Sequence, residues 1–204
     1  MRLIIIIIIV ASVLGAIGTF MIIGSQFPAS SSTSDARGDA VAVRTYEAGE
    51  EPVVQPYHDV LGASVHRLNN RELLLTIELN GDPNANTLYE TVYIWDIEYS
   101  TLGRTQKYTI IIPHFPPEFG VSSGWHIAIF DHGANAYTVP LKKIGMMPND
   151  RVEVNIDPSI IGNPSSFYWQ TFVMIRVEPV FDKPPEFLID SAPDNDTVLL
   201  SPFS

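Results

Sequence analysis

The chain has 204 residues, a formal net charge of −11 and no cysteine. The lack of cysteine excludes disulfides, thiolate zinc sites and cysteine nucleophiles. The acidic charge leaves no basic surface of the kind that nucleic-acid binding needs, so no nucleic acid is expected among the partners.

An uncharged apolar segment begins the chain at residues 3–24. About 20 such residues span the hydrocarbon core of a bilayer, so the segment is predicted to be a transmembrane anchor. A cleaved signal peptide is the alternative, although its apolar part is usually shorter and ends at a small-residue cleavage site. Arg2 precedes the segment and the next basic residue is Arg37, which places the N-terminus in the cytoplasm. We expect a single-pass protein of the cell membrane whose domain is extracytoplasmic.

Residues 25–56 separate this segment from the domain. Residues 25–40 are rich in Ser, Ala, Gly and Asp, a composition typical of a flexible stalk, whereas residues 41–56 either remain disordered or add an edge strand. We assign residues 25–56 to a stalk, residues 57–194 to one domain and residues 195–204 to a frayed tail. Asn195 begins the sequon Asn-Asp-Thr and is a candidate glycosylation site in an exported chain.

Short β-rich runs separated by turn residues fill the domain. Residues 59–68 and 71–79 are expected to form a hairpin that turns at Asn69-Asn70, because Asn tolerates a positive φ. Residues 88–99 contain a continuous apolar stretch, which indicates a central strand. The other expected strands are residues 107–112, 125–130, 136–141, 151–156 and 167–178. The strand at residues 136–141 is expected to form a hairpin with the strand at residues 125–130.

Two sequence features set boundaries between these runs. Pro113 lacks a backbone donor and is expected to end the strand before it. Asp157 and Pro158 predict the start of one helical turn, which Gly162 ends. The eight to nine short strands that result predict an all-β protein with an antiparallel β-sandwich after the transmembrane helix, with closure into a barrel as the alternative.

One stretch connects the domain to a known group. Residues 155–170 read NIDPSIIGNPSSFYWQ, a strand followed by a Pro-x-x-x-Gly-x-Pro turn and an aromatic strand, and residues 189–194 close the domain as IDSAPD. This order resembles the DOMON-like and family-9 carbohydrate-binding-module-like sandwiches of surface proteins. The resemblance implies binding of sugar or haem, or service as an accessory module, and it implies a structural calcium ion.

Four aromatic residues are candidates for stacking on a sugar ring: Trp125, Tyr137, Tyr168 and Trp169. The alternative is that the two tryptophans fill the core, as large aromatic residues in sandwich strands commonly do. The resemblance also implies that Asp59, Asp190 and Asp194 supply oxygen ligands to calcium where the two ends of the domain meet. Their alternative role is to cap turns.

Two further readings of the sequence concern chemistry. His126 or His132 with Met146 or Met147 would ligate haem, but no attachment motif supports this reading. Asp96 and Glu98 share one face of a strand, yet no catalytic motif accompanies them, so we expect no enzyme activity. Two function classes follow: a surface module that binds a glycan or other small ligand, or a structural or accessory component of the cell envelope that binds protein partners.

Overall fold

The computed structural model describes residues 29–44, 51–117, 123–177, 186–194 and 197–201. Within these ranges no helix has both the length and the apolar character needed to cross a bilayer. The predicted anchor at residues 3–24 and the sequon at Asn195 lie outside the described residues.

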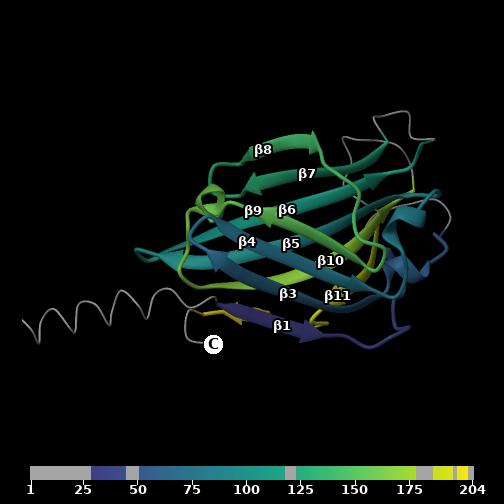
Figure 1. The fold of residues 1–204 in the computed structure, drawn as a ribbon, viewed down its shortest axis with the longest axis horizontal. Helices are drawn as coiled ribbons and strands as arrows, with labels where there is room; N and C mark the ends of the chain where they lie inside the picture. The colour runs from purple at the N-terminus through teal and green to yellow at the C-terminus, as the bar shows by residue number, and fades with distance from the viewer. Residues whose placement is uncertain (1–28, 45–50, 118–122, 178–185, 195–196, 202–204) are drawn as a thin grey trace, which may run out of the picture.

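Two antiparallel sheets make up the described part of the chain (Figure 1). The smaller sheet has the order β1-β3-β4-β9, and its strands are β1 (Ser30–Ser34), β3 (Val60–Asn69), β4 (Glu72–Leu79) and β9 (Arg151–Ile156). The larger sheet has the order β2-β11-β10-β5-β6-β7-β8, with β12 paired to β10. Its strands are β2 (Val43–Arg44), β5 (Glu90–Thr101), β6 (Arg104–Phe115), β7 (Gly124–Asp131), β8 (Ala136–Lys143), β10 (Phe167–Arg176), β11 (Phe187–Ala192) and β12 (Val198–Leu200).

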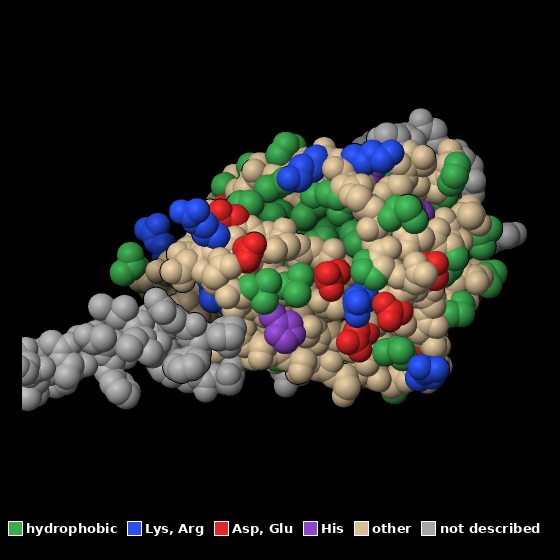
Figure 2. Space-filling view, viewed as in Figure 1, with side chains coloured by type: hydrophobic (Ala, Val, Ile, Leu, Met, Phe, Trp, Pro, Cys, Tyr) green, Lys and Arg blue, Asp and Glu red, His purple; other side chains and the backbone are tan. Residues whose placement is uncertain are grey.

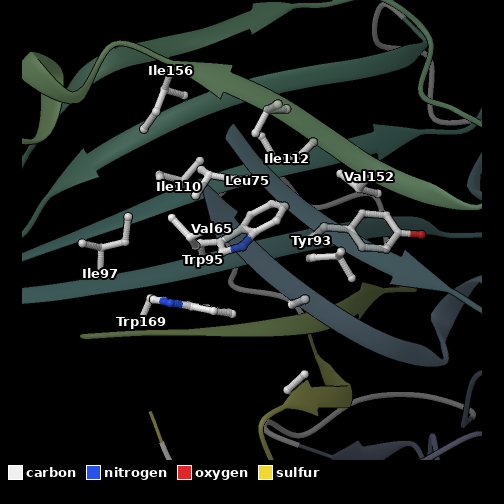
Figure 3. Close-up of a cluster of buried hydrophobic side chains, with 14 of the residues drawn as sticks. Val65, Leu75, Tyr93, Trp95, Ile97, Ile110, Ile112, Val152, Ile156 and Trp169 are labelled. Atoms are coloured by element: carbon white, nitrogen blue, oxygen red, sulfur yellow. The ribbon is translucent and has the colours of Figure 1, made fainter. Parts of the chain in front are cut away.

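The core lies between the two sheets, as expected for a sandwich. Successive side chains of a strand point to opposite faces, so one face of each sheet supplies the apolar layer. In β9 the alternation is complete, since Val152, Val154 and Ile156 are buried between more exposed neighbours. Figure 3 shows how the two layers meet, with Val65 and Leu75 of the smaller sheet packed against residues of the larger one. Those include Tyr93, Trp95, Ile97, Ile110, Ile112 and Trp169.

Several sequence predictions are confirmed. β9 spans the six residues expected, and β7 pairs with β8 as a hairpin. The 3-10 helix η4 (Pro158–Ile161) starts at Asp157, whose carboxylate accepts from the Ser159 amide, and ends at Gly162 with φ of 79°. The first hairpin forms as expected, but its two turn residues are Asn70 and Arg71, one position later than predicted.

The flexible stalk predicted for residues 25–40 is wrong at Ser30–Ser34, where β1 pairs with β3. β2 pairs with β11 at the edge of the larger sheet, in agreement with the edge-strand alternative for residues 41–56. The Ser-rich composition of β1 concealed it, because pairing uses main-chain groups and an edge strand does not require an apolar side-chain pattern. The tail likewise contains β12, and the segment after residue 178 contains β11, neither of which was expected.

Pro113 does not end its strand. β6 continues to Phe115, and Pro113 lies opposite Val92 of β5. On the other side, the register between β6 and β7 has no partner for Ile112 or Pro113. The missing backbone donor is therefore accommodated by a local gap in one ladder, which lets the strand continue.

A buried polar cluster closes the end of the sandwich at η1 (Pro56–His58). His58 is fully buried, its Nδ1 accepts from the Gln55 amide at 3.1 Å, and its Nε2 lies 3.2 Å from Thr91 Oγ1. The side-chain amide of Asn86 links Thr91 to His114. Asn86 Nδ2 donates to Thr91 Oγ1 and lies 3.4 Å from His114 Nδ1. Burial lowers the pKa of His58 from 6.5 to about 3 and that of His114 to about 4, so both rings are neutral in the fold.

This cluster is expected to make the protein sensitive to acid. An unfolded histidine takes up a proton below pH 6.5 whereas folded His58 resists it until about pH 3, so stability falls as pH drops through that window. We expect the free energy of unfolding of the wild type to lose about 2 kcal/mol more between pH 7 and pH 5 than that of a His58→Gln variant. Urea unfolding at the two pH values measures the difference. Parallel pH dependence of the two proteins would contradict a neutral, desolvated His58.

Candidate functional site

The four aromatic residues predicted to contact sugar divide by sheet face. Trp125 is 2% exposed and Trp169 is fully buried, so the alternative reading of both tryptophans as core residues is confirmed. Trp125 Nε1 donates to Asn84 Oδ1 and Trp169 Nε1 donates to Ser31 Oγ, which satisfies both indoles internally. Neither ring face is available for stacking, because each indole packs in the layer between the two sheets.

Tyr168 and Tyr137 instead face solvent, at 51% and 56% exposure. Tyr168 precedes buried Trp169 in β10, so strand alternation directs it to the outer face of the larger sheet. Tyr137 contacts Phe130 of β7 with ring centroids 5.2 Å apart, and Phe130 follows buried Ile129. Both tyrosines therefore belong to the outer face, Tyr168 on β10 and Tyr137 on the edge strand β8.

Cross-strand neighbours of β5, β6 and β7 lie between the two tyrosines. Tyr168 lies opposite Glu98 of β5, which lies opposite Lys107 of β6. The Lys107 ammonium is 2.7 Å from a carboxylate oxygen of Asp96. The next row contains Asp96 and Thr109, which donates to Asp96 at 2.6 Å.

His132 and Phe130 continue this surface towards Tyr137. His132 Nε2 lies 2.8 Å from Thr109 Oγ1, and its ring packs edge-on against Phe130 at 5.1 Å. Phe130 in turn contacts Tyr137. We call the surface formed by Tyr168, Glu98, Lys107, Asp96, Thr109, His132, Phe130 and Tyr137 the outer-face platform.

The platform has the chemistry of a shallow polar binding surface. Beside Tyr168 a depression of about 220 Å³ is lined by Asp96, Glu98, Lys107 and Gln170, among others. Carboxylate, ammonium and amide groups there can accept from and donate to hydroxyl groups, while the tyrosine rings offer apolar faces. Asp96 and Glu98 do share this face as expected, but Asp96 is already engaged by Lys107 and Thr109.

A second feature is a cluster of five aspartates between β1, β3 and β11. Asp35, Asp190 and Asp194 form one group of neighbouring carboxylates, and Asp39, Asp59 and Asp190 form another. Asp190 belongs to both groups, so the structure brings the three predicted calcium ligands close to one another, with Asp194 in the first group and Asp59 in the second.

The aspartates also have structural roles here. Asp59 accepts from the Gly38 amide at 2.9 and 3.0 Å and from Asn80 Nδ2 at 2.8 Å. Asp190 accepts from the Val60 amide at 2.7 Å and thereby links the larger sheet to the first residue of β3. The alternative role as caps of backbone groups is thus present for Asp59 and Asp190.

None of the five aspartates forms an ion pair with another described residue. Burial raises the pKa of Asp190 from 3.8 to about 7, and the carboxylates of Asp35 and Asp39 add to this shift. Burial, followed by the charges of Asp194, Asp39 and Asp59, raises the pKa of Asp35 to about 6. The Oδ2 atom of Asp35 is buried and has no hydrogen-bond partner among the described residues.

These properties fit a calcium ion. Calcium takes six to eight oxygen ligands, and the cluster offers only oxygen donors. A divalent cation would compensate the crowded carboxylates and would give Asp35 Oδ2 a partner. Asp35, Asp39, Asp59, Asp190 and Asp194 are the residues that would hold it.

Sequence reasoning missed Asp35 and Asp39 because both lie in the range assigned to the stalk. The one local signal is their position in the segment Asp-Ala-Arg-Gly-Asp, which is typical of a turn.

The haem hypothesis finds no support in the placement of its residues. His126 lies between inward-facing Trp125 and Ile127, so its side chain points away from the core, whereas Met147 is buried in the core.

Comparisons of the chain with protein-family models, with curated proteins and with solved structures found no match.

Proposed function

We propose that this chain is a non-catalytic, extracytoplasmic β-sandwich module that binds a carbohydrate on its outer-face platform. Residues 3–24 anchor it in the cell membrane, with the N-terminus in the cytoplasm. We also propose that the domain is related to the DOMON-like and family-9 carbohydrate-binding-module-like sandwiches. Its support is the pair of antiparallel sheets and the one-turn element η4 directly before β10.

One observation carries the binding proposal. Tyr168 and Tyr137 are exposed at the two ends of the outer-face platform, and linked polar side chains of β5 and β6 lie between them. Four strand spacings separate β10 from β8, which is about 19 Å. A surface of this length suits an oligosaccharide, whose hydroxyl groups meet Asp96, Lys107 and His132 while sugar rings stack on the terminal tyrosines.

Replacing either tyrosine is expected to weaken glycan binding without unfolding the protein. Tyr168→Ala and Tyr137→Ala should each reduce affinity about tenfold, since losing about 1.4 kcal/mol of stacking is one factor of ten. The measurement is a glycan array with the full-length chain in detergent, followed by titration with the best ligand. Leu102→Ala, at a fully exposed turn position away from the platform, is the matched control.

The outcomes separate the proposal from its alternative. Unchanged affinity in both tyrosine variants would place any glycan elsewhere, and no binding across the array would favour the envelope-component function. A specific observation supports that second function: β9 is an edge strand beside an apolar groove, where a protein partner could pair with the sheet.

A further inference from the structure

A hollow lies between β8 and β9 in the described structure, on the side of the molecule opposite the outer-face platform. Its volume is about 370 Å³, and apolar side chains form most of its floor, including Ile127, Ile129, Val139, Val154 and Ile156. Figure 2 shows these apolar side chains as a green area at the bottom of a depression, below two basic side chains on its upper rim.

The groove exists because the larger sheet extends past the smaller one. β9 is the last strand of the four-stranded sheet, and β8 is the last strand of the larger sheet on the same side (Figure 1). No described strand of the smaller sheet covers the inner face of β8, whose residues are exposed along nearly its whole length. One further strand beside β9 would cover this face and complete the sandwich.

One edge of β9 has no partner strand among the residues that the structure describes, and its hydrogen-bonding positions are defined. In an antiparallel pair, hydrogen-bonded and non-hydrogen-bonded residue pairs alternate. The Leu79 amide donates to Asp150 O at 2.8 Å, and the register then assigns the bonds towards β4 to Val152, Val154 and Ile156. The backbone N–H and C=O groups of Arg151, Glu153 and Asn155 therefore point away from β4, along the open edge.

We propose that an extended polypeptide segment of a partner protein adds to β9 as a fifth strand of the smaller sheet. Its main chain pairs with Arg151, Glu153 and Asn155. Its alternate side chains are apolar and fill the floor at Ile129 and Val139. A small apolar molecule would fill the floor but would leave the open edge of β9 unpaired, so a strand fits both walls of the groove better.

The charges at the two ends of the groove indicate where the proposed segment, which we take as antiparallel to β9, is acidic. Lys142 and Lys143 end β8, and seven residues connect them to the start of β9, so both lysines lie at the Arg151 end. No described carboxylate forms an ion pair with either lysine, whereas Arg151 is paired with Asp150 and Glu153. Asp157 follows β9 at the opposite end. A strand antiparallel to β9 would have its carboxyl end beside the lysines, so the segment is acidic at that end.

The edge of β8 is a poor alternative for pairing. Pro140 lies in the middle of β8 and lacks a donor, and Lys142 and Lys143 follow it. Proline and lysine on an edge strand are the residues that discourage addition of another strand. β9 has no proline and only one basic residue. An added strand is therefore expected to pair with the edge of β9 and not with the edge of β8.

The test uses a fluorescent octapeptide in which threonine and valine alternate over six positions before two aspartates. The control peptide has the same composition with the aspartates at its amino end. The full-length chain in detergent is expected to bind the first peptide at least tenfold more tightly than the second. Amide hydrogen exchange is expected to slow at Arg151, Glu153 and Asn155 on binding, with no change at Val152 and Val154, which are already bonded to β4.

Protein variants locate the site. Val139→Asp, which places a charge on the floor, and Asn155→Pro, which removes one outward donor, should each weaken binding at least tenfold. Leu141→Asp on the same strand, at a residue that is exposed and does not line the groove, should have no effect. Equal binding of both peptides, or no binding of either, would overturn the proposal. Binding without slowed exchange at the three β9 amides would also overturn it, because the peptide would then not pair with the edge of β9.

Discussion

Removal of divalent cations with EDTA is expected to lower the melting temperature of this protein by about 5 to 10 °C relative to millimolar calcium. A ligand at about 100 times its dissociation constant stabilises the native state by about 2.7 kcal/mol. For a domain of this size each kcal/mol shifts the melting temperature by about 2 to 4 °C. The physical cause is compensation of the five carboxylates that crowd around Asp190. Calorimetry or circular dichroism in EDTA, with and without added calcium, measures the shift.

The pH dependence of this shift has a definite sign. The folded pKa values of Asp35 and Asp190 are raised from 3.8 to about 6 and about 7. Without a cation, the stability that these two groups contribute is therefore present at low pH and is lost as pH rises through the folded values. Calcium binds the ionised carboxylates, so its stabilising effect should be larger at pH 7.5 than at pH 5. His58 and His114, whose folded pKa values are lowered, make stability fall as pH drops. The melting temperatures with and without calcium must therefore be compared at the same pH.

Asp35→Asn provides the matched variant. The amide keeps the acceptor for the Ala36 N–H and replaces Oδ2, the buried oxygen without a partner. After discounting for solvent screening, relief of charge crowding is worth about 1 kcal/mol, or about 3 °C, in EDTA at pH 7.5. The same variant should respond less to calcium than the wild type. An equal calcium response in both proteins, or no response in the wild type, would remove the aspartate cluster as a calcium site.

Trp169→Ala is expected to destabilise the protein by about 3 to 5 kcal/mol, the cost of removing a fully buried aromatic side chain. The melting temperature should fall by about 10 °C or more. The indole contributes twice, since it fills the core and its Nε1 donates to Ser31 Oγ at 2.8 Å, which ties β10 to the edge strand β1. Thermal or urea unfolding measures the loss.

The adjacent residue supplies the control for this experiment. Tyr168 faces solvent, so Tyr168→Ala should change stability by less than about 0.5 kcal/mol while it weakens glycan binding. Trp169→Phe should cost about 1 kcal/mol, since it keeps an aromatic ring but loses the hydrogen bond to Ser31. A Trp169→Ala variant that melted like the wild type would show that the indole is not part of the core.

The order of pairing decided several features that local patterns did not show. β1 is recognisable as a strand only through its pairing with β3, because its serines carry no apolar alternation. The two aspartates near it, Asp35 and Asp39, meet Asp190 only once β1 and β11 lie at the same end of the sandwich. The groove between β8 and β9 likewise depends on the unequal widths of the two sheets, which no single strand encodes.

The sequence by itself determined the all-β class, the bounds of β9, the hairpins and the one-turn element η4. These follow from side-chain alternation and from the backbone preferences of Asn, Pro and Gly, which act over a few neighbouring residues. Only the tertiary structure decided which aromatic residues face solvent: Trp169 and Tyr168 are adjacent and chemically similar, and the face on which each lies depends on which side the second sheet packs. Packing between residues far apart in the chain thus separated the core from the outer-face platform, since burial is a property of the assembled sheets.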